Sequence, residues 1–250
     1  MPLAVHQFPC LSDNYGFLAH DEATGKTACI DTPEVAPILA ALKAKGWTLD
    51  LILNTHWHPD HAGGNAEIAA ATGATIVGPA EVTKLTPIDR EVKGGDVVML
   101  GETRLEVIES GGHTLGHIAY FDAADRIAFV GDTLFALGCG RLFEGTAEQM
   151  WGSLQRLAAL PDDTTVYCAH EYTASNARFA LSVDDGPALK ARAAEIFAMR
   201  ERGEPTVPTT IGLEKATNPF LRAPELVGTA GEPDYMAFGA VRTAKDNFKG

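Results

Sequence analysis

The sequence predicts an α/β fold built in layers, and three observations support this expectation. Short apolar or alternating runs, which are typical of strands, recur through the first 170 residues. Segments with helical periodicity lie between those runs, and this alternation is typical of layered α/β proteins. The chain has 250 residues, of which 46% are hydrophobic, so it is long enough for one large domain or one and a half, with a core that needs no disulfide.

Three helices are expected in this first part of the chain. A helix over 35–45 ends at Gly46, because glycine readily adopts the left-handed conformation that closes a helix. An alanine-rich helix over 66–71 ends at Gly73 for the same reason, and a third helix covers 146–160. Strands are expected over residues 3–8, 15–20, 26–31, 51–53, 74–77, 97–100, 104–109, 118–121, 126–130 and 165–168.

The chain changes character after about residue 174. Helical periodicity continues over 176–181 and 187–202, and a last helix is expected over 234–248. No strand is expected in this part. We therefore predict a sheet-containing domain over 1–174 and a small α-helical domain over 175–250.

The charge of the chain excludes one large class of partners. Lys and Arg total 20 and Asp and Glu total 33, so the formal net charge is −13. Such an acidic surface repels nucleic acids, and an anionic small molecule would need basic residues gathered locally. There is no signal-peptide pattern, no apolar run of the roughly 20 residues that cross a membrane, and no CxxC pair among the four cysteines. We expect a cytoplasmic, monomeric protein with no nucleic-acid or membrane partner.

The segment from His56 to His61 carries four potential metal ligands directly after an apolar strand. Its sequence is His-Trp-His-Pro-Asp-His. Imidazole and carboxylate together suit zinc, iron or manganese, whereas calcium and magnesium prefer oxygen ligands. On extended backbone His56, His58 and Asp60 point to one side, whereas His61 points elsewhere and suits a second ion. Three of the chain's eight histidines lie here, which favours a metal site over a polar turn.

Three other predicted strands are followed by a residue that can bind a metal. These residues are His113, Asp132 and His170. Ligand sites in α/β sheets collect outside the carboxyl ends of strands, so we expect the four strand ends to converge on one cleft. Five histidines and two aspartates suffice for two ions if one aspartate bridges them. The remaining histidines are expected to be structural, namely His6, His20 and His117, the last through a hydrogen bond.

Four motifs, in chain order, resemble the metallo-β-lactamase superfamily: THWHPDH, GGHTLGH, GDTLF and CAHEY. This resemblance implies an αββα sandwich with a dinuclear metal site at one edge. Within the superfamily, the chain is similar to the glyoxalase II (hydroxyacylglutathione hydrolase) family in GDTLFALGCGRLFEGT, CAHEYT, TIGLEKATNPFLR and AVRTAKDNFK. The resemblance covers nearly the whole chain. It implies a catalytic domain over 1–174 and a glutathione-substrate-binding helical domain over 175–250.

The resemblance implies a role for each metal ligand. One ion would be held by His56, His58 and His113, and the other by Asp60, His61 and His170, with Asp132 as the bridge. We expect two divalent ions, with Zn²⁺ as the first choice and Fe or Mn as alternatives. Asp60 and Asp132 would be the catalytic carboxylates, with a metal-bound hydroxide as nucleophile.

The resemblance also implies the residues that recognise glutathione. They are Arg141, Phe143, Tyr172, Arg242 and Lys245. The family commonly has lysine and tyrosine at the first two of these positions. Arg141 keeps the positive charge and adds a bidentate fork, whereas Phe143 lacks a hydroxyl and therefore one hydrogen bond. The alternative interpretation of Arg242 and Lys245 is that they lie on a solvated helix face.

The implied reaction is hydrolysis of an S-(2-hydroxyacyl)glutathione, S-D-lactoylglutathione, to glutathione and D-lactate. This is the second step of methylglyoxal detoxification. A thiol has a pKa near 8.5 and can leave as an anion, so no general acid is needed. Cys139 and Cys168 have no recognisable base beside them and are expected to be structural thiols.

The alternative enzyme on this scaffold is an iron-dependent glutathione persulfide dioxygenase. It would hold one metal through His56, His113 and Asp132. The second ligand set and the C-terminal AVRTAKDNFK favour hydrolysis. A β-lactamase or lactonase function is disfavoured because it leaves the helical C-terminal part without a role. A nuclease would need a basic face, which this acidic chain does not offer. A metal sensor would not need both ligand sets.

Overall fold

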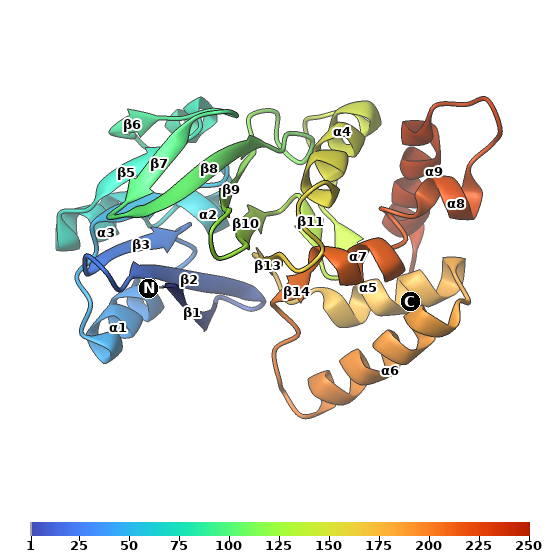
Figure 1. Ribbon diagram of the computed structural model, residues 1–250, viewed down its shortest axis with the longest axis horizontal. Helices are drawn as coiled ribbons and strands as arrows, with labels where there is room; N and C mark the ends of the chain where they lie inside the picture. Colours follow the sequence, from blue (N-terminus) through green and yellow to red (C-terminus); the bar gives the residue numbers. More distant parts are fainter. Residues whose placement is uncertain (1) are drawn as a thin grey trace. The chain divides into compact units, whose positions relative to one another are not determined.

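The computed structural model describes residues 2–250, which form two compact units (Figure 1). The first unit contains residues 2–109 and 116–131, and the second contains 110–115 and 132–250. The predicted division at residue 174 follows composition along the chain, and it stays a prediction. Among the described residues, no helix is both long and apolar enough to span a membrane.

The first unit begins with a six-stranded sheet in which the strands follow one another in chain order. The sheet is antiparallel from β1 to β3 and parallel from β3 to β6. Between its parallel strands run the helices α1 (Val35–Lys45) and α3 (Asn65–Thr72), which bury apolar side chains such as Ile38 and Ile68 against the sheet. Its strands are β1 (Leu3–Cys10), β2 (Asn14–Asp21), β3 (Lys26–Ile30), β4 (Leu51–Leu53), β5 (Thr75–Gly78) and β6 (Arg90–Glu91).

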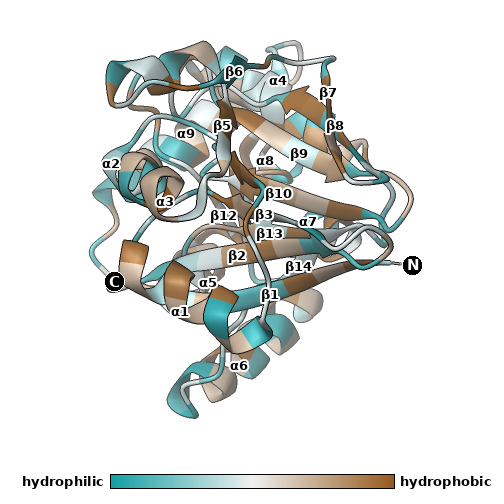
Figure 2. Ribbon diagram, turned by 90° about the vertical axis from the view of Figure 1, so that its left-hand side faces the viewer, coloured by the Kyte–Doolittle hydropathy of each residue, from teal (hydrophilic) through white to brown (hydrophobic). Residues whose placement is uncertain are grey.

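Four antiparallel strands of the same unit pack on this first sheet. The ring of Phe17 in β2 lies 6.0 Å from that of Phe129 in β10, and the Tyr120 hydroxyl donates to the Asn54 carbonyl at 2.9 Å. Both β9 and β10 are buried throughout, and Figure 2 draws them largely in hydrophobic colours. The strands are β7 (Val97–Leu100), β8 (Thr103–Glu109), β9 (Ile118–Asp122) and β10 (Ile127–Gly131), preceded by the short 3-10 helix η1 (Ala80–Lys84).

The second unit is mainly helical. Helices α5 and α6 pack together around Leu137 and Leu189, and α9 packs on α4 and α8. Its helices are α4 (Ala147–Ala158), α5 (Thr173–Val183), α6 (Pro187–Glu201), α7 (Ile211–Thr217), α8 (Ala223–Val227) and α9 (Asp234–Asn247). Its strands are β11 (Leu134–Phe135), β12 (Gly138–Cys139), β13 (Thr165–Cys168) and β14 (Thr209–Thr210).

Several predicted elements are confirmed at their predicted ends. Helix α1 ends before Gly46, whose φ is 69°, and α3 ends before Gly73, whose φ is 77°. Helix α4 begins after Thr146, whose side chain accepts a hydrogen bond from the Gln149 amide. The expectation of no strand after residue 174 is wrong, because β14 pairs with β13. A two-residue strand has no periodic pattern, so only its partner reveals it.

Candidate metal centre and substrate site

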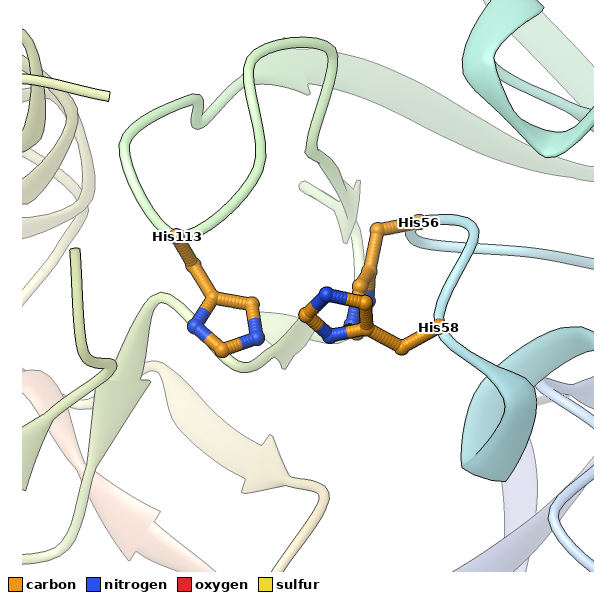
Figure 3. A group of neighbouring side chains, drawn as sticks. All are labelled: His56, His58 and His113. Carbon is orange, nitrogen blue, oxygen red and sulfur yellow. Dashed lines mark hydrogen bonds between the residues drawn. The ribbon is translucent and has the colours of Figure 1, made fainter. Parts of the chain in front are cut away.

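The loop after β4 carries two histidines whose ring nitrogens face each other. His56 Nε2 lies 3.1 Å from His58 Nδ1, and His56 is fully buried. Figure 3 draws both rings, together with that of His113 from the loop after β8. Two nitrogens bound at about 2.05 Å to a tetrahedral zinc ion are about 3.3 Å apart. The separation between these two nitrogens therefore suits two ligands of one ion.

The next two candidate ligands lie in the short helix α2 (Pro59–Ala62). The expectation that the backbone stays extended through Asp60 is wrong, because Pro59 starts a helical turn with its φ already set. His61 is buried, and its Nε2 lies 3.5 Å from Asp60 Oδ2. Asn14 donates to the same carboxylate oxygen at 3.1 Å. The helical turn therefore brings the two candidate metal ligands, Asp60 and His61, close together.

Asp31, which the sequence reasoning missed, lies behind these histidines. Its Oδ2 accepts a hydrogen bond from His61 Nδ1 at 2.8 Å and one from the Thr55 hydroxyl at 2.8 Å. Because the Thr55 hydrogen is used there, its oxygen accepts from His56 Nδ1 at 3.0 Å. Both histidines then carry hydrogen on Nδ1 and a lone pair on Nε2, the atom that would bind metal. The available signal was an aspartate directly after an apolar strand, as at Asp132.

Thr55 can lie close to the end of β10 because that strand ends in a glycine, Gly131. A Cβ on Gly131, whose φ is 48°, would lie 2.6 Å from Thr55 Oγ1 and 2.7 Å from His117 Nε2. The buried His117 ring stacks on that of His56 with centroids 4.7 Å apart. His117, expected to be structural, thus supports the ring of a candidate ligand.

In the second unit, the carboxylate of Asp132 lies between two histidines. Its Oδ2 is 3.3 Å from His113 Nε2 and its Oδ1 is 3.3 Å from His170 Nε2. All three side chains are buried. His113 Nδ1 donates to the Arg141 carbonyl at 2.9 Å, so its Nε2 bears the lone pair. A carboxylate with one oxygen toward each of two histidines has the arrangement that a bridging ligand needs.

The two basic residues of α9 differ in their surroundings. Arg242 is only 5% exposed, and its Nη1 donates to the Cys139 carbonyl at 3.0 Å while its Nη2 donates to Asp246 at 2.7 Å. Lys245 donates to the Ser175 carbonyl and hydroxyl, both at 3.1 Å. Neither residue therefore sits on a purely solvated face.

Desolvation by partial burial, together with the positive charges of Arg242, Arg141 and Arg178, lowers the pKa of Lys245 to about 8, while Asp246 opposes the shift. The ordinary value for lysine is about 10.5. Lys245 therefore loses its charge within a pH range accessible to experiment.

Two exposed aromatic rings lie against candidate ligands of the second unit. Phe143 is 62% exposed, and its ring is edge-on to that of His113 with centroids 5.2 Å apart. The Tyr172 ring stacks on that of His170 at 4.6 Å. The Arg141 side chain is mostly exposed. Rings and a cation beside the ligands suit a substrate with an apolar stem and anionic ends.

The two cysteines considered as nucleophiles are buried and make no disulfide. Burial raises the pKa of the Cys139 thiol to about 11 and that of the Cys168 thiol to about 12. The thiolate is the nucleophilic form, so burial disfavours a nucleophilic role at both positions.

Comparison with known proteins places the chain in a class. Residues 21–170 match the family model of the Metallo-beta-lactamase superfamily, and residues 171–248 match that of the Hydroxyacylglutathione hydrolase C-terminus. The chain has the metallo-β-lactamase fold with a C-terminal helical region, as the motifs predict. Within that superfamily it belongs to the hydroxyacylglutathione hydrolase family.

One curated relative carries this family name, and two solved structures are similar to the chain in fold. A "Hydroxyacylglutathione hydrolase" from Erythrobacter litoralis (strain HTCC2594) is 58% identical over 250 residues, which covers 98% of this chain and 100% of the relative. The crystal structure of ETHE1 from Myxococcus xanthus has a TM-score of 0.70 and 27% identity, covering 100% of this chain and 92% of that one. TTHA1623 in a di-iron-bound form has a TM-score of 0.63 and 25% identity, covering 87% and 100%.

Proposed function

We propose that this chain hydrolyses the thioester of an S-(2-hydroxyacyl)glutathione, with S-D-lactoylglutathione as the substrate and D-lactate as the acid product. The observation that carries the proposal is the presence, in one chain, of buried and half-buried His/Asp donor sets and the C-terminal region of hydroxyacylglutathione hydrolases. The persulfide dioxygenase alternative has less support, because relatives over the whole chain carry the hydrolase name.

Two divalent transition-metal ions are part of this proposal. His56, His58 and His113 would hold one ion, Asp60, His61 and His170 the other, and Asp132 would serve both. The donor chemistry fits, because neutral imidazoles and carboxylates suit zinc, iron and manganese. The di-iron form of the relative TTHA1623 supports a pair of ions, and zinc is our first choice for this chain. When bound, such a pair lowers the pKa of water to about 7 and polarises a carbonyl.

The chain's own residues prepare these donors before any substrate arrives. Asp31 fixes the tautomer of His61 directly and that of His56 through Thr55. The Arg141 carbonyl does the same for His113. Hydrogen-bonded partners of this kind raise the basicity of a ligand and set its direction. The departing thiolate needs no proton from the protein, because a thiol pKa near 8.5 makes it a good leaving group.

Recognition of glutathione is assigned in this proposal to the second unit. Glutathione thioesters carry two carboxylates and one ammonium, and a chain with a net charge of −13 must offset its own field to attract them. Arg141 and Lys245 offer accessible positive charge, and Arg242 adds charge from a buried position. The exposed rings of Phe143 and Tyr172 would contact the apolar part of the substrate.

The cellular setting is also a proposal. Four buried cysteines without disulfides suit a reducing compartment, and we propose the cytoplasm. The expected monomer stays a prediction.

The decisive experiment measures hydrolysis of S-D-lactoylglutathione by the purified protein, with metal content determined on the same sample. We expect turnover that disappears with a chelator and returns when metal is restored. A parallel sample receives glutathione persulfide while oxygen uptake is recorded. Oxygen consumption without thioester hydrolysis would replace the hydrolase by the dioxygenase.

A further inference from the structure

The hairpin formed by β11 and β12 is held by side chains from two helices. Its turn is buried, and Leu137 in the turn has a φ of 56°, in the left-handed region that leucine rarely adopts. The Asn176 side chain donates to the Ala136 carbonyl at 3.1 Å. Asn218 donates to the carbonyls of Phe135 and Gly138 at 3.2 and 3.0 Å. Backbone groups that would be costly to bury alone are therefore satisfied from outside the hairpin.

Another contact on this turn is made by a buried carboxylate. Glu214 Oε2 accepts from the Leu137 amide and from the Asn218 side chain, both at 2.9 Å. Its Oε1 accepts from Arg192 and from the Thr209 hydroxyl. Glu214 is fully buried, and Arg192 is nearly so. All four groups around this carboxylate are donors, so the site requires an acceptor at both oxygens.

The hairpin connects two residues of the proposed centre. Asp132 precedes β11 by two positions, and Arg141 follows β12 by two. The two ends of the hairpin are joined by a hydrogen bond from the Gly140 amide to the Thr133 carbonyl at 3.2 Å. The Arg141 carbonyl in turn receives the hydrogen bond from His113 Nδ1. A shift of the hairpin would therefore move a substrate-binding side chain and the group that orients a metal ligand.

We propose that Glu214, neutralised by Arg192, is a positioning residue that fixes the β11–β12 hairpin for binding of the glutathione thioester. This inference rests on the proposed function. Glu214 acts through the Leu137 amide and touches neither substrate nor metal in this proposal. Its helix α7 lies in the sequence segment TIGLEKATNPFLR, whose charged and amide side chains otherwise have no part in the proposed chemistry.

The test compares two double variants that both remove the buried charge pair. A single Glu214 variant would leave Arg192 buried and uncompensated, which destabilises a protein strongly. Arg192→Met/Glu214→Gln keeps an oxygen for the Leu137 amide and turns its NH₂ toward the Thr209 oxygen. Arg192→Met/Glu214→Leu removes that acceptor. The matched control is the pair Glu225→Gln and Glu225→Leu, at an exposed carboxylate of α8.

We expect KM for S-D-lactoylglutathione to be roughly tenfold higher in the Leu double variant than in the Gln double variant, because small misplacements of binding groups reduce activity by such factors. The Leu137 amide should also exchange hydrogen faster in the Leu variant, with no such difference in β2. The Glu225 pair should show equal KM values. All assays are run well below the unfolding temperature of each variant.

Equal KM and equal hydrogen exchange in the two double variants would overturn the proposal. A faster Leu137 exchange with equal KM would also overturn it, since the hairpin would then be held without consequence for binding. If the native protein neither hydrolyses nor binds glutathione thioesters, the proposed function fails instead. The exchange comparison would still report whether Glu214 holds the hairpin.

Discussion

Asp31 accepts a hydrogen bond from His61 at 2.8 Å, and the contact fixes which ring nitrogen of the histidine is available to a metal. The carboxylate is buried at the end of β3, where Asp31 adopts a φ of 57°. That left-handed backbone follows an apolar strand of five residues and places the carboxylate beside Thr55 as well. One acidic side chain thus fixes the tautomer of His61 directly and that of His56 through Thr55.

Replacing Asp31 should weaken metal binding more than it weakens the fold. In Asp31→Asn one carboxylate oxygen becomes an NH₂, so either the Thr55 backbone amide or the His61 and Thr55 side-chain donors lose their acceptor. The negative charge that raises the basicity of the His61 ring is lost in both cases. Loss of such an outer partner typically reduces metal affinity about 10- to 100-fold. Competition with a chelator of known affinity measures this change. Asp162→Asn, at an exposed ion pair with Lys215, is the control and should leave affinity unchanged.

Sequence patterns predict the helices and strands whose bounds are set by residues close together in the chain. Helix α1 and strand β4 have the predicted bounds, because Gly46 marks the end of the helix and a short apolar run marks the strand. The role of Asp31 depends on β3 lying beside β4, a pairing between residues far apart in sequence. The Glu214–Arg192 pair likewise depends on how α6 meets α7. Such partners become visible only when the chain is folded.

The candidate site shows the same contrast between features set by neighbouring residues and features set by the fold. Histidine spacing predicts that His56 and His58 act together, and their facing nitrogens agree with that spacing. The extended backbone expected at Asp60 failed, because Pro59 favours the first turn of a helix as much as a loop. The buried position of Arg242 was also not foreseen, since charged residues on a terminal helix are usually solvated.

Metal content tests the role of Asp132. We expect close to two transition-metal ions per native chain by elemental analysis. Asp132→Ala removes an oxygen from beside each of His113 and His170, so metal content should fall and hydrolysis should drop by about 10²-fold or more. A native value of one ion, unchanged when metal is added, would favour the dioxygenase instead. Full activity in the variant would show that Asp132 is an ordinary turn residue.

Phe143 offers a test by gain of a group. The ring is exposed beside His113. The resemblance to the hydroxyacylglutathione hydrolase family implies a tyrosine where this chain has Phe143. Phe143→Tyr introduces a hydroxyl that we expect to donate one hydrogen bond to glutathione, worth about 0.5–1.5 kcal/mol. KM should therefore fall roughly two- to tenfold. Phe143→Leu keeps an apolar side chain but removes the ring, and it should raise KM. An unchanged KM in the tyrosine variant would place the glutathione elsewhere.

The last prediction concerns the pH at which the substrate is held. Lys245 has a pKa of about 8, lowered by burial and by Arg242, Arg141 and Arg178, with Asp246 as the facing acid. The lysine is therefore charged below pH 8 and neutral above it, so its attraction for a glutathione carboxylate is lost as pH rises. KM should accordingly rise as pH increases from 7 to 9, with a smaller change in kcat.

Two variants separate this lysine from other titrating groups. Lys245→Ala removes a charge-assisted hydrogen bond worth about 1.5–3 kcal/mol, so KM at pH 7 should rise roughly ten- to a hundredfold and lose its pH dependence. Lys245→Arg keeps its charge at pH 9, and its KM should stay flat across the same range. Added salt should raise KM in the native protein and in the arginine variant, because screening weakens the attraction. The prediction would be contradicted if the native KM changed with neither pH nor salt and the alanine variant had the same KM. Lys245 would then have no role in glutathione recognition, and the assignment of the metal ligands would not be affected.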